Sequence, residues 1–205
     1  MKAIKKFVIL GPESTGKSTL CKSLAVHFQS AWCEEYAREY LLTHGTNYKY
    51  EDLYTIAEGQ IKGEESIINS MMHPKPSTLN PQPSTLNLPP STLNPQPLFI
   101  DTDLQVIKVW SEFVFNKCDN RILTQIAKRQ YDLYLLCNTD LPWVKDELRE
   151  YPDPETREKL YHYYKETMIN QPVPWVEISG NYEERLKKAI DAVTELFVAT
   201  KTQSL

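Results

Sequence analysis

The segment that most constrains the fold of this chain is Gly11-Pro12-Glu13-Ser14-Thr15-Gly16-Lys17-Ser18, which directly follows the apolar run Phe7-Val8-Ile9-Leu10. Two glycines separated by four residues and followed by Lys and Ser are typical of a phosphate-binding loop, whose backbone N–H groups surround the phosphates. Next, Leu20, Leu24 and Phe28 recur every four residues, as on a helix with one apolar face. A strand, this loop and a helix in that order predict a domain that handles a nucleoside triphosphate.

Two side chains of the loop have predictable roles. Lys17 would reach the β- and γ-phosphates of ATP, and the Ser18 hydroxyl would ligate Mg²⁺. The alternative is a turn that matches the pattern by chance. The strand before the loop and the helix after it favour the phosphate-binding interpretation.

Length and composition favour a single cytoplasmic domain that binds a small molecule. A chain of 205 residues suits one α/β domain, and a formal net charge of −4 gives no reason to expect a nucleic-acid surface. The four cysteines are scattered without zinc or redox spacing, so we expect reduced thiols. No signal peptide or membrane span is expected. The sequence carries no signal for the oligomeric state.

The apolar runs predict five strands that alternate with helices, which is typical of a parallel sheet covered on both faces. The strands are expected at 4–10, 31–34, 98–101, 133–137 and 175–178. The helices are expected from the loop to about 29, and at 35–42, 51–72, 104–116, 120–129, 154–169 and 183–199. Asn181 and Glu184 form a capping box for the last helix.

A repeat interrupts this scheme. From Pro76 to Pro97 the chain repeats Pro-Ser-Thr-Leu-Asn-Pro-Gln three times, with the middle copy varied. Proline in every copy excludes a coiled coil, so we interpret residues 75–97 as a disordered or polyproline-like insertion in one domain that spans 1–205. A docking site for a proline-recognising partner is the alternative.

Two acids follow the strand that ends in Phe99-Ile100-Asp101-Thr102-Asp103. In phosphate-loop enzymes an aspartate at this place orients Mg²⁺ beside the loop serine, and we assign that role to Asp101. An ordinary helix cap is the alternative. For Asp103 a ligand role and a cap role are both open.

The second strand ends in Glu34-Glu35-Tyr36-Ala37-Arg38. Ligands of parallel sheets lie beyond the carboxyl ends of the strands, so Glu35 is a candidate general base for an acceptor hydroxyl. Arg38, three residues on, can share its helix face and hold phosphate or substrate. A solvated, charged helix start is the alternative interpretation.

Several motifs together resemble the ribosylnicotinamide kinase domain of NadR-type proteins. They cover nearly the whole chain apart from the repeat. The motifs are Gly11 to Leu20, Glu35-Tyr36-Ala37-Arg38-Glu39-Tyr40-Leu41, Ile56-Ala57-Glu58-Gly59-Gln60, Asp101-Thr102-Asp103, Trp110 and Asp140-Leu141-Pro142-Trp143 followed by Arg149. The resemblance implies an α/β phosphate-loop NTPase with sheet order 2-3-1-4-5 and transfer of the ATP γ-phosphate to the 5′-hydroxyl of nicotinamide riboside.

The resemblance also implies roles for individual residues. ATP and Mg²⁺ would be bound by Gly11, Glu13, Ser14, Thr15, Gly16, Lys17, Ser18 and Thr19. The acceptor would lie near Glu35, Tyr36, Arg38, Asp103, Trp110 and Trp143. Arg149 and Arg157 are candidates for a mobile lid that closes on the phosphates, and Trp110 and Trp143 for a sandwich around a cationic pyridinium ring. For Trp110, core packing on a helix is the alternative.

The chain departs from the multifunctional members of that family, because no further domain fits before Gly11. We therefore expect neither NAD synthesis from the mononucleotide nor DNA binding. The leading hypothesis is an ATP- and Mg²⁺-dependent nicotinamide riboside kinase. A kinase for another nucleoside or nucleotide, and a regulatory ATPase without a metabolite acceptor, remain the alternatives.

Overall fold

A sheet of five parallel strands forms the centre of the protein, of which the computed structural model describes residues 4–73 and 95–202. The strands are β1 (Ile4–Leu10), β2 (Ala31–Cys33), β3 (Gln96–Asp101), β4 (Leu133–Cys137) and β5 (Trp175–Ile178). Their order is β2-β3-β1-β4-β5, and Phe7 of β1 lies opposite Phe99 of β3 and Leu133 of β4. The predicted 2-3-1-4-5 sheet is confirmed.

The third strand begins at Gln96 rather than at Leu98. Gln96 and Pro97 pair with Ile4 and Lys5 of β1, while β2 joins β3 only from Leu98. A proline is tolerated here because this part of the strand has a neighbour on one side only. The predicted insertion therefore ends before Gln96, and residues 74–94 lie outside the part of the chain that the structure describes.

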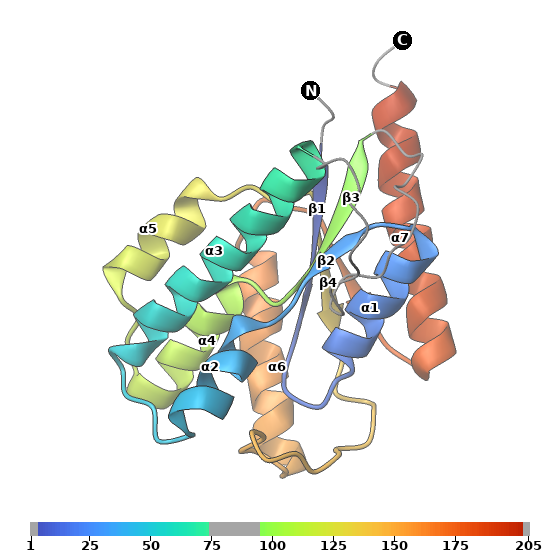
Figure 1. The fold of residues 1–205 in the computed structure, drawn as a ribbon. Helices are drawn as coiled ribbons and strands as arrows, with labels where there is room; N and C mark the ends of the chain where they lie inside the picture. Colours follow the sequence, from blue (N-terminus) through green and yellow to red (C-terminus); the bar gives the residue numbers. More distant parts are fainter. Residues whose placement is uncertain (1–3, 74–94, 203–205) are drawn as a thin grey trace, which may run out of the picture.

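Helices cover both faces of the sheet (Figure 1). On one face lie α1 (Lys17–His27) and α7 (Tyr182–Thr202). On the other side are α3 (Asp52–Met72), α4 (Leu104–Phe115), α5 (Asn120–Lys128) and α6 (Pro154–Ile169), while α2 (Tyr36–His44) follows β2. Within the described ranges no helix has the length and apolar character that a membrane span requires.

The central strand β1 carries apolar side chains on both faces of the sheet, so helices must cover both faces. Phe7 and Ile9 pack toward α1 and α7, Val8 and Leu10 pack toward the opposite helices, and all four are 0% exposed. A strand buried on both faces reads as a continuous apolar run, which is the pattern before the phosphate loop. All four cysteines lie within the described ranges and are free thiols.

Local capping fixes several helix starts. The Asn181 side chain accepts hydrogen bonds from the N–H groups of Glu183 and Glu184, and the Glu184 carboxylate accepts one from Asn181 N–H at 2.8 Å. This confirms the predicted capping box. Asp153 caps α6, whose first residue is Pro154.

Candidate active site

The phosphate-binding loop connects β1 to α1 and bends where side chains do not fit. Gly11 has φ +137°, and a Cβ there would lie 2.6 Å from the carbonyl oxygen at the end of β4. Gly16 has φ +78° and immediately precedes α1. The Pro12 carbonyl accepts hydrogen bonds from the Thr15 hydroxyl (2.7 Å) and the Lys17 ammonium (2.9 Å). A helix N-terminus with a lysine beside it is suited to hold phosphates.

A buried arginine that sequence analysis missed supports the loop. Arg185 of α7 is 2% exposed and donates to the carbonyls of Thr15 (2.9 Å), Asn138 (2.9 Å) and Gly180 (2.7 Å), and it pairs with Asp140. A trans peptide points its C=O and N–H in opposite directions, so the bond to Thr15 turns the next N–H away from Arg185. No local pattern marks this arginine, because its loop partner lies 170 positions earlier.

Asp101, the last residue of β3, is suited to a cation. It is 2% exposed, and its Oδ1 has no hydrogen-bond partner among the described residues. Burial and the nearby Glu35 carboxylate raise the pKa of Asp101, while Lys17 and a hydrogen bond from Ser18 lower it. An unpartnered carboxylate oxygen beside a serine hydroxyl fits Mg²⁺, which prefers oxygen ligands. The described residues contain no cluster of three or more His, Cys, Asp or Glu suited to a metal. In phosphate-loop enzymes the ion is shared with phosphate oxygens, and here Ser18 and Asp101 would be its protein ligands.

The sequence left two roles open for Asp103, and in the structure it caps a helix. Its carboxylate accepts hydrogen bonds from Gln105 N–H (3.0 Å) at the start of α4 and from the Tyr134 hydroxyl (2.9 Å). It is 1% exposed, and this burial raises its pKa to about 7. The structure therefore does not bring Asp103 to the surface of the cavity, in contrast to its expected contact with substrate.

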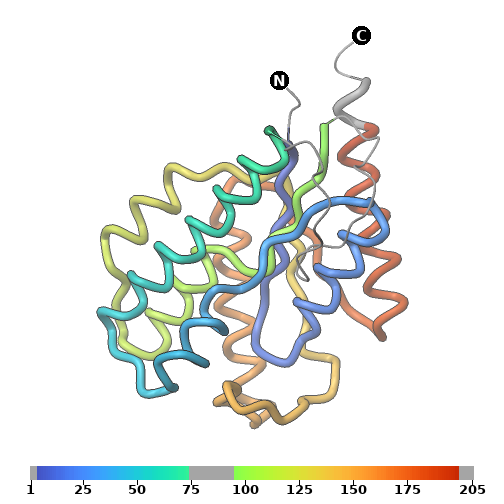
Figure 2. The backbone as a smooth tube through the Cα atoms, in the orientation of Figure 1, coloured from blue at the N-terminus to red at the C-terminus, as the bar shows by residue number. Residues whose placement is uncertain are grey.

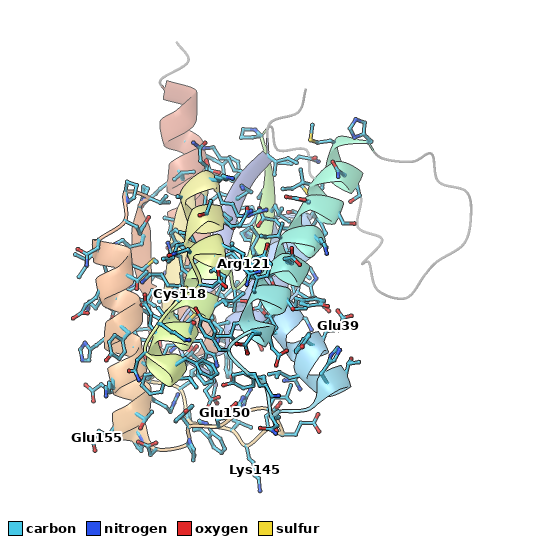
Figure 3. The ribbon with its side chains drawn as sticks, turned by 90° about the vertical axis from the view of Figure 1, so that its left-hand side faces the viewer. Glu39, Cys118, Arg121, Lys145, Glu150 and Glu155 are labelled. Carbon is cyan, nitrogen blue, oxygen red and sulfur yellow. The ribbon has the colours of Figure 1, made fainter. Side chains whose placement is uncertain are left out.

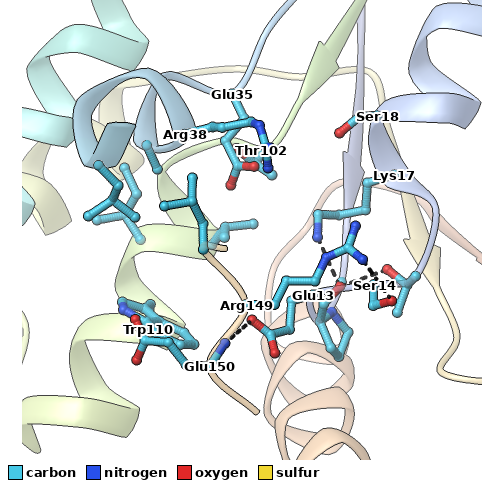
Figure 4. Close-up of a pocket in the computed structure, with 18 of the residues that line it drawn as sticks. Glu13, Ser14, Lys17, Ser18, Glu35, Arg38, Thr102, Trp110, Arg149 and Glu150 are labelled. Carbon is cyan, nitrogen blue, oxygen red and sulfur yellow. Dashed lines mark hydrogen bonds between the residues drawn. The ribbon is translucent and has the colours of Figure 1, made fainter. Parts of the chain in front are cut away.

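A cavity of about 240 Å³ lies between the phosphate loop and the start of α2. Lys17 and Arg149 lie on one side of it, and Glu35 and Arg38 on the other (Figure 4). The rest of its lining is largely apolar and includes Leu41, Leu53, Ile56, Val106, Ile107 and Trp110. A charged part that suits phosphates thus continues into an apolar part that suits a ring.

The start of α2 supplies two of its three expected site residues to the cavity. Glu35 precedes the helix, and its carboxylate makes no capping hydrogen bond to it. The Arg38 guanidinium also lines the cavity but forms two hydrogen bonds, of 3.2 and 3.1 Å, with Asp146. The Tyr36 ring instead packs on Gly59, where an added Cβ would lie 2.0 Å from it. Tyr36 is therefore held against α3 and does not line the cavity.

Residues 138–153 join β4 to α6 and are termed the connecting segment below; Figure 2 traces their course past the phosphate loop. In Figure 3 Lys145 and Glu150 mark the segment between α6 and α2. Arg149 of this segment lines the cavity and donates a hydrogen bond of 3.3 Å to the Ser14 hydroxyl. The structure therefore brings Arg149 next to the phosphate loop.

Arg157 is not brought to the same place. It lies on α6, is 6% exposed, and does not line the cavity. Its guanidinium donates a hydrogen bond of 3.3 Å to the carbonyl of Leu141. Arg157 therefore supports the connecting segment through Leu141 and, unlike Arg149, does not line the cavity.

The two tryptophans expected to sandwich a ring are separated in this structure. Trp110 lines the cavity, and its indole N–H donates a hydrogen bond of 2.7 Å to the Tyr48 hydroxyl. Trp143 does not line it; its indole N–H points to the Glu13 carboxylate at 3.4 Å. The reason is that the connecting segment is bonded to the phosphate loop, which holds Trp143 at the loop.

Tyr48 and Glu150 line the cavity although no sequence pattern indicated them. Burial and the Glu13 carboxylate raise the pKa of Glu150, while a hydrogen bond from Tyr48 lowers it. Trp110, Tyr48 and Glu150 thus line one cavity, in which Trp110 donates a hydrogen bond to Tyr48. The three residues belong to α4, the α2–α3 loop and the connecting segment, which meet only in the folded protein.

Comparison with known proteins agrees with this architecture. The chain is 23% identical over 198 residues to the trifunctional NAD biosynthesis/regulator protein NadR of Escherichia coli (strain K12), and 23% identical over 194 residues to NadR of Salmonella typhimurium. Each match covers 94% of this chain and 43% of the relative, so the chain spans less than half of those proteins. These matches confirm the resemblance to NadR-type proteins.

Solved structures show the same fold. A crystal structure of NadR in complex with NR has a TM-score of 0.71 and 24% identity, covering 94% of this chain and 49% of that one. Thymidylate kinase from Ehrlichia chaffeensis has a TM-score of 0.61 and 11% identity, covering 93% and 99%. A model of the AAA domain matches residues 6–79 and 85–185. Since that match spans most of the 205 residues, the chain belongs to this AAA domain family of phosphate-loop proteins.

Proposed function

We propose that this protein is an ATP-dependent kinase whose acceptor is the 5′-hydroxyl of nicotinamide riboside, with nicotinamide mononucleotide as the product. The observation that carries the proposal is a single cavity with the phosphate loop on one side and Glu35 on the other. A phosphate held at Lys17 and a hydroxyl held at Glu35 would therefore meet in one space. Holding both reactants in line supplies much of the rate in phosphoryl transfer.

Each polar residue of the cavity has a role in this proposal. Lys17 and Arg149 would stabilise negative charge on the transferred group, and the connecting segment would exclude water from it. Glu35 would accept the proton of the acceptor hydroxyl. Ser18 and Asp101 would hold Mg²⁺, which offsets phosphate charge when bound.

The apolar part of the cavity supports a flat, cationic acceptor. Trp110 and Tyr48 offer aromatic surface, and Glu150 lines the same cavity. A pyridinium ring is attracted to aromatic faces and to a carboxylate. The NadR relatives add support, since they are named for NAD biosynthesis. Solved structures of NadR proteins were obtained in complex with NR, and with NAD and AMP-PNP.

The test is ADP release from Mg-ATP with nicotinamide riboside, adenosine, cytidine, thymidine monophosphate or no acceptor, with the product mass measured. Lys17→Ala is the inactive control. Stimulation by nicotinamide riboside alone is the expected result. Stimulation only by another acceptor would support the kinase activity but show that the substrate is not nicotinamide riboside. Hydrolysis that no acceptor changes would contradict the kinase and favour a regulatory ATPase.

A further inference from the structure

Gln60 of α3 joins two strand ends of the candidate site. It is 3% exposed, and its side-chain amide bonds to residues that follow β2 and β3. Its carbonyl oxygen accepts a hydrogen bond of 2.8 Å from Tyr36 N–H, and its NH₂ group donates to the Thr102 carbonyl at 3.1 Å and to Cys33 Sγ at 3.7 Å. These contacts connect the element that carries Glu35 with the element that carries Asp101.

The bond to Tyr36 N–H fixes the backbone immediately after Glu35. Tyr36 is the first residue of α2, and its N–H is one of the groups that a helix start leaves without an internal partner. A side chain at the preceding position commonly accepts hydrogen bonds from the second or third N–H group of the helix. Here Gln60 bonds Tyr36 N–H, and the Glu35 carboxylate makes no cap bond. Gln60 therefore holds the backbone immediately after Glu35, and Glu35, which makes no cap bond, lines the cavity.

Gly59 supports the same junction by packing. An added Cβ at Gly59 would lie 2.0 Å from the Tyr36 ring, so the ring occupies the space that a side chain would fill. One turn further along the helix, a Cβ at Gly63 would lie 3.6 Å from Cys33 Sγ, which is an ordinary contact. Of these two glycines of α3, only Gly59 lies where a side chain would clash.

The bond to Thr102 fixes the other strand end. Thr102 has φ +64°, which is unusual for a β-branched residue and persists only where the surroundings enforce it. Its N–H donates to Ile9 O at 3.0 Å, and its carbonyl accepts from Gln60. The turn that follows Asp101 is therefore held from both sides.

We propose that Gln60, with Gly59, is a positioning residue for the transfer reaction, because it fixes Glu35 and the Asp101–Thr102 turn relative to each other. This inference rests on the proposed kinase function. The acceptor wall depends on Gln60, whereas the phosphate loop has its own support from Arg185. Loss of Gln60 should therefore lower turnover much more than the affinity for ATP.

The test compares two variants of Gln60. Gln60→Met removes the hydrogen bonds to Tyr36, Thr102 and Cys33 at similar side-chain length, whereas Gln60→Glu keeps an oxygen for Tyr36 N–H but loses the donor. The control is Gln105→Met, a buried glutamine of α4 that does not line the cavity. The measurements are kcat with the best acceptor, the Kd of a non-hydrolysable ATP analogue, and hydrogen exchange at Tyr36 N–H. A second pair is Gly59→Ala against Gly63→Ala.

For Gln60→Met we expect kcat to fall about a hundredfold, as small misplacements of a reacting group do. The Kd of the analogue should change less than about twofold while exchange at Tyr36 accelerates, because the phosphate loop is untouched. The kcat of Gln60→Glu should lie between the kcat of Gln60→Met and that of the wild type. Gly59→Ala should lower kcat, and Gly63→Ala and Gln105→Met should not.

Two results would overturn the inference and leave the proposed function intact. One is a wild-type kcat in both Gln60→Met and Gly59→Ala, and the other is an equal loss of kcat and of ATP affinity in these variants. If Gln60→Met does not fold, the glycine pair decides by the same measurements. A wild-type protein that no acceptor stimulates would overturn the proposed function, and the inference with it.

Discussion

The Glu13 carboxylate of the phosphate loop accepts a hydrogen bond of 2.7 Å from Tyr151 N–H, 138 positions later in the chain. A second bond of 3.0 Å comes from the adjacent Glu150 N–H. Hydrogen bonds to an ionised acceptor are stronger than neutral ones. Through them a residue of the loop fixes the connecting segment, and Arg149 with it, next to the site expected to hold phosphates.

Glu13→Gln should loosen the connecting segment, because a neutral amide accepts these bonds less strongly. Hydrogen exchange at Tyr151 N–H should accelerate about tenfold, which corresponds to about 1.4 kcal/mol. Glu155→Gln is the matched control, since it removes the same charge from an exposed position on α6. Unchanged exchange at Tyr151 would show that other contacts hold the segment.

Arg185→Lys should weaken ATP binding, because a single ammonium cannot replace the bonds that Arg185 makes to Thr15, Asn138 and Gly180. We expect the KM for ATP to rise about tenfold or more while the KM for the acceptor stays within about twofold. Arg129→Lys, an ion-paired arginine remote from the cavity, is the control. An equal rise in both KM values would argue for a general structural role.

Glu35→Gln preserves the shape of the side chain and removes its capacity to accept a proton. Turnover should fall by about 10²–10⁴-fold with ATP affinity unchanged, as is usual for loss of a general base. The neighbouring, exposed Glu34 offers a control in Glu34→Gln. Steady-state kinetics that give wild-type turnover for Glu35→Gln would remove this residue from the proposed base role.

Asp52 should make stability depend on pH in the acid range. Hydrogen bonds from Lys49 N–H (2.7 Å) and the Tyr40 hydroxyl (2.9 Å) lower its pKa below the ordinary 3.8. A lowered carboxyl pKa stabilises the folded state above the unfolded value, and this contribution is lost as the pH falls through the folded value. The Tm difference between wild type and Asp52→Asn should be constant from pH 6 to 8 and shrink below about pH 4.

Thermal unfolding at a series of pH values measures this difference. Asp191→Asn, at an exposed position of α7, supplies the comparison. A Tm difference for Asp52→Asn that does not change between neutral and acid pH would contradict the assignment.

We propose that the domain tolerates replacement of residues 75–94 by a short Gly/Ser linker. The reason is that closure entropy grows slowly with loop length, so shortening the loop changes stability by only about a kcal/mol or two. Gln96 and Pro97 must be kept, because they pair with β1. Soluble expression, Tm and the ADP assay check this; insoluble protein would show that the repeat is structural.

The sequence by itself determined the features that depend on neighbours along the chain. The loop from Gly11 to Ser18 is local, because its glycines, Lys17 and Ser18 act through backbone geometry within a few residues. The helices and strands follow from apolar periodicity, and the Asn181 capping box from spacing alone. Asp101 was identified because an acid at the end of an apolar strand has a fixed place in a parallel sheet.

Only the tertiary structure decided which distant side chains meet. Gln60 and Thr102 are 42 positions apart, Glu13 and Tyr151 are 138, and Thr15 and Arg185 are 170. The positions of Trp143 and Arg157 also depend on tertiary packing. Because the connecting segment docks on the phosphate loop, Trp143 lies beside Glu13 and Arg157 lies beneath Leu141. Such contacts depend on how whole elements pack, and no periodicity or spacing encodes them.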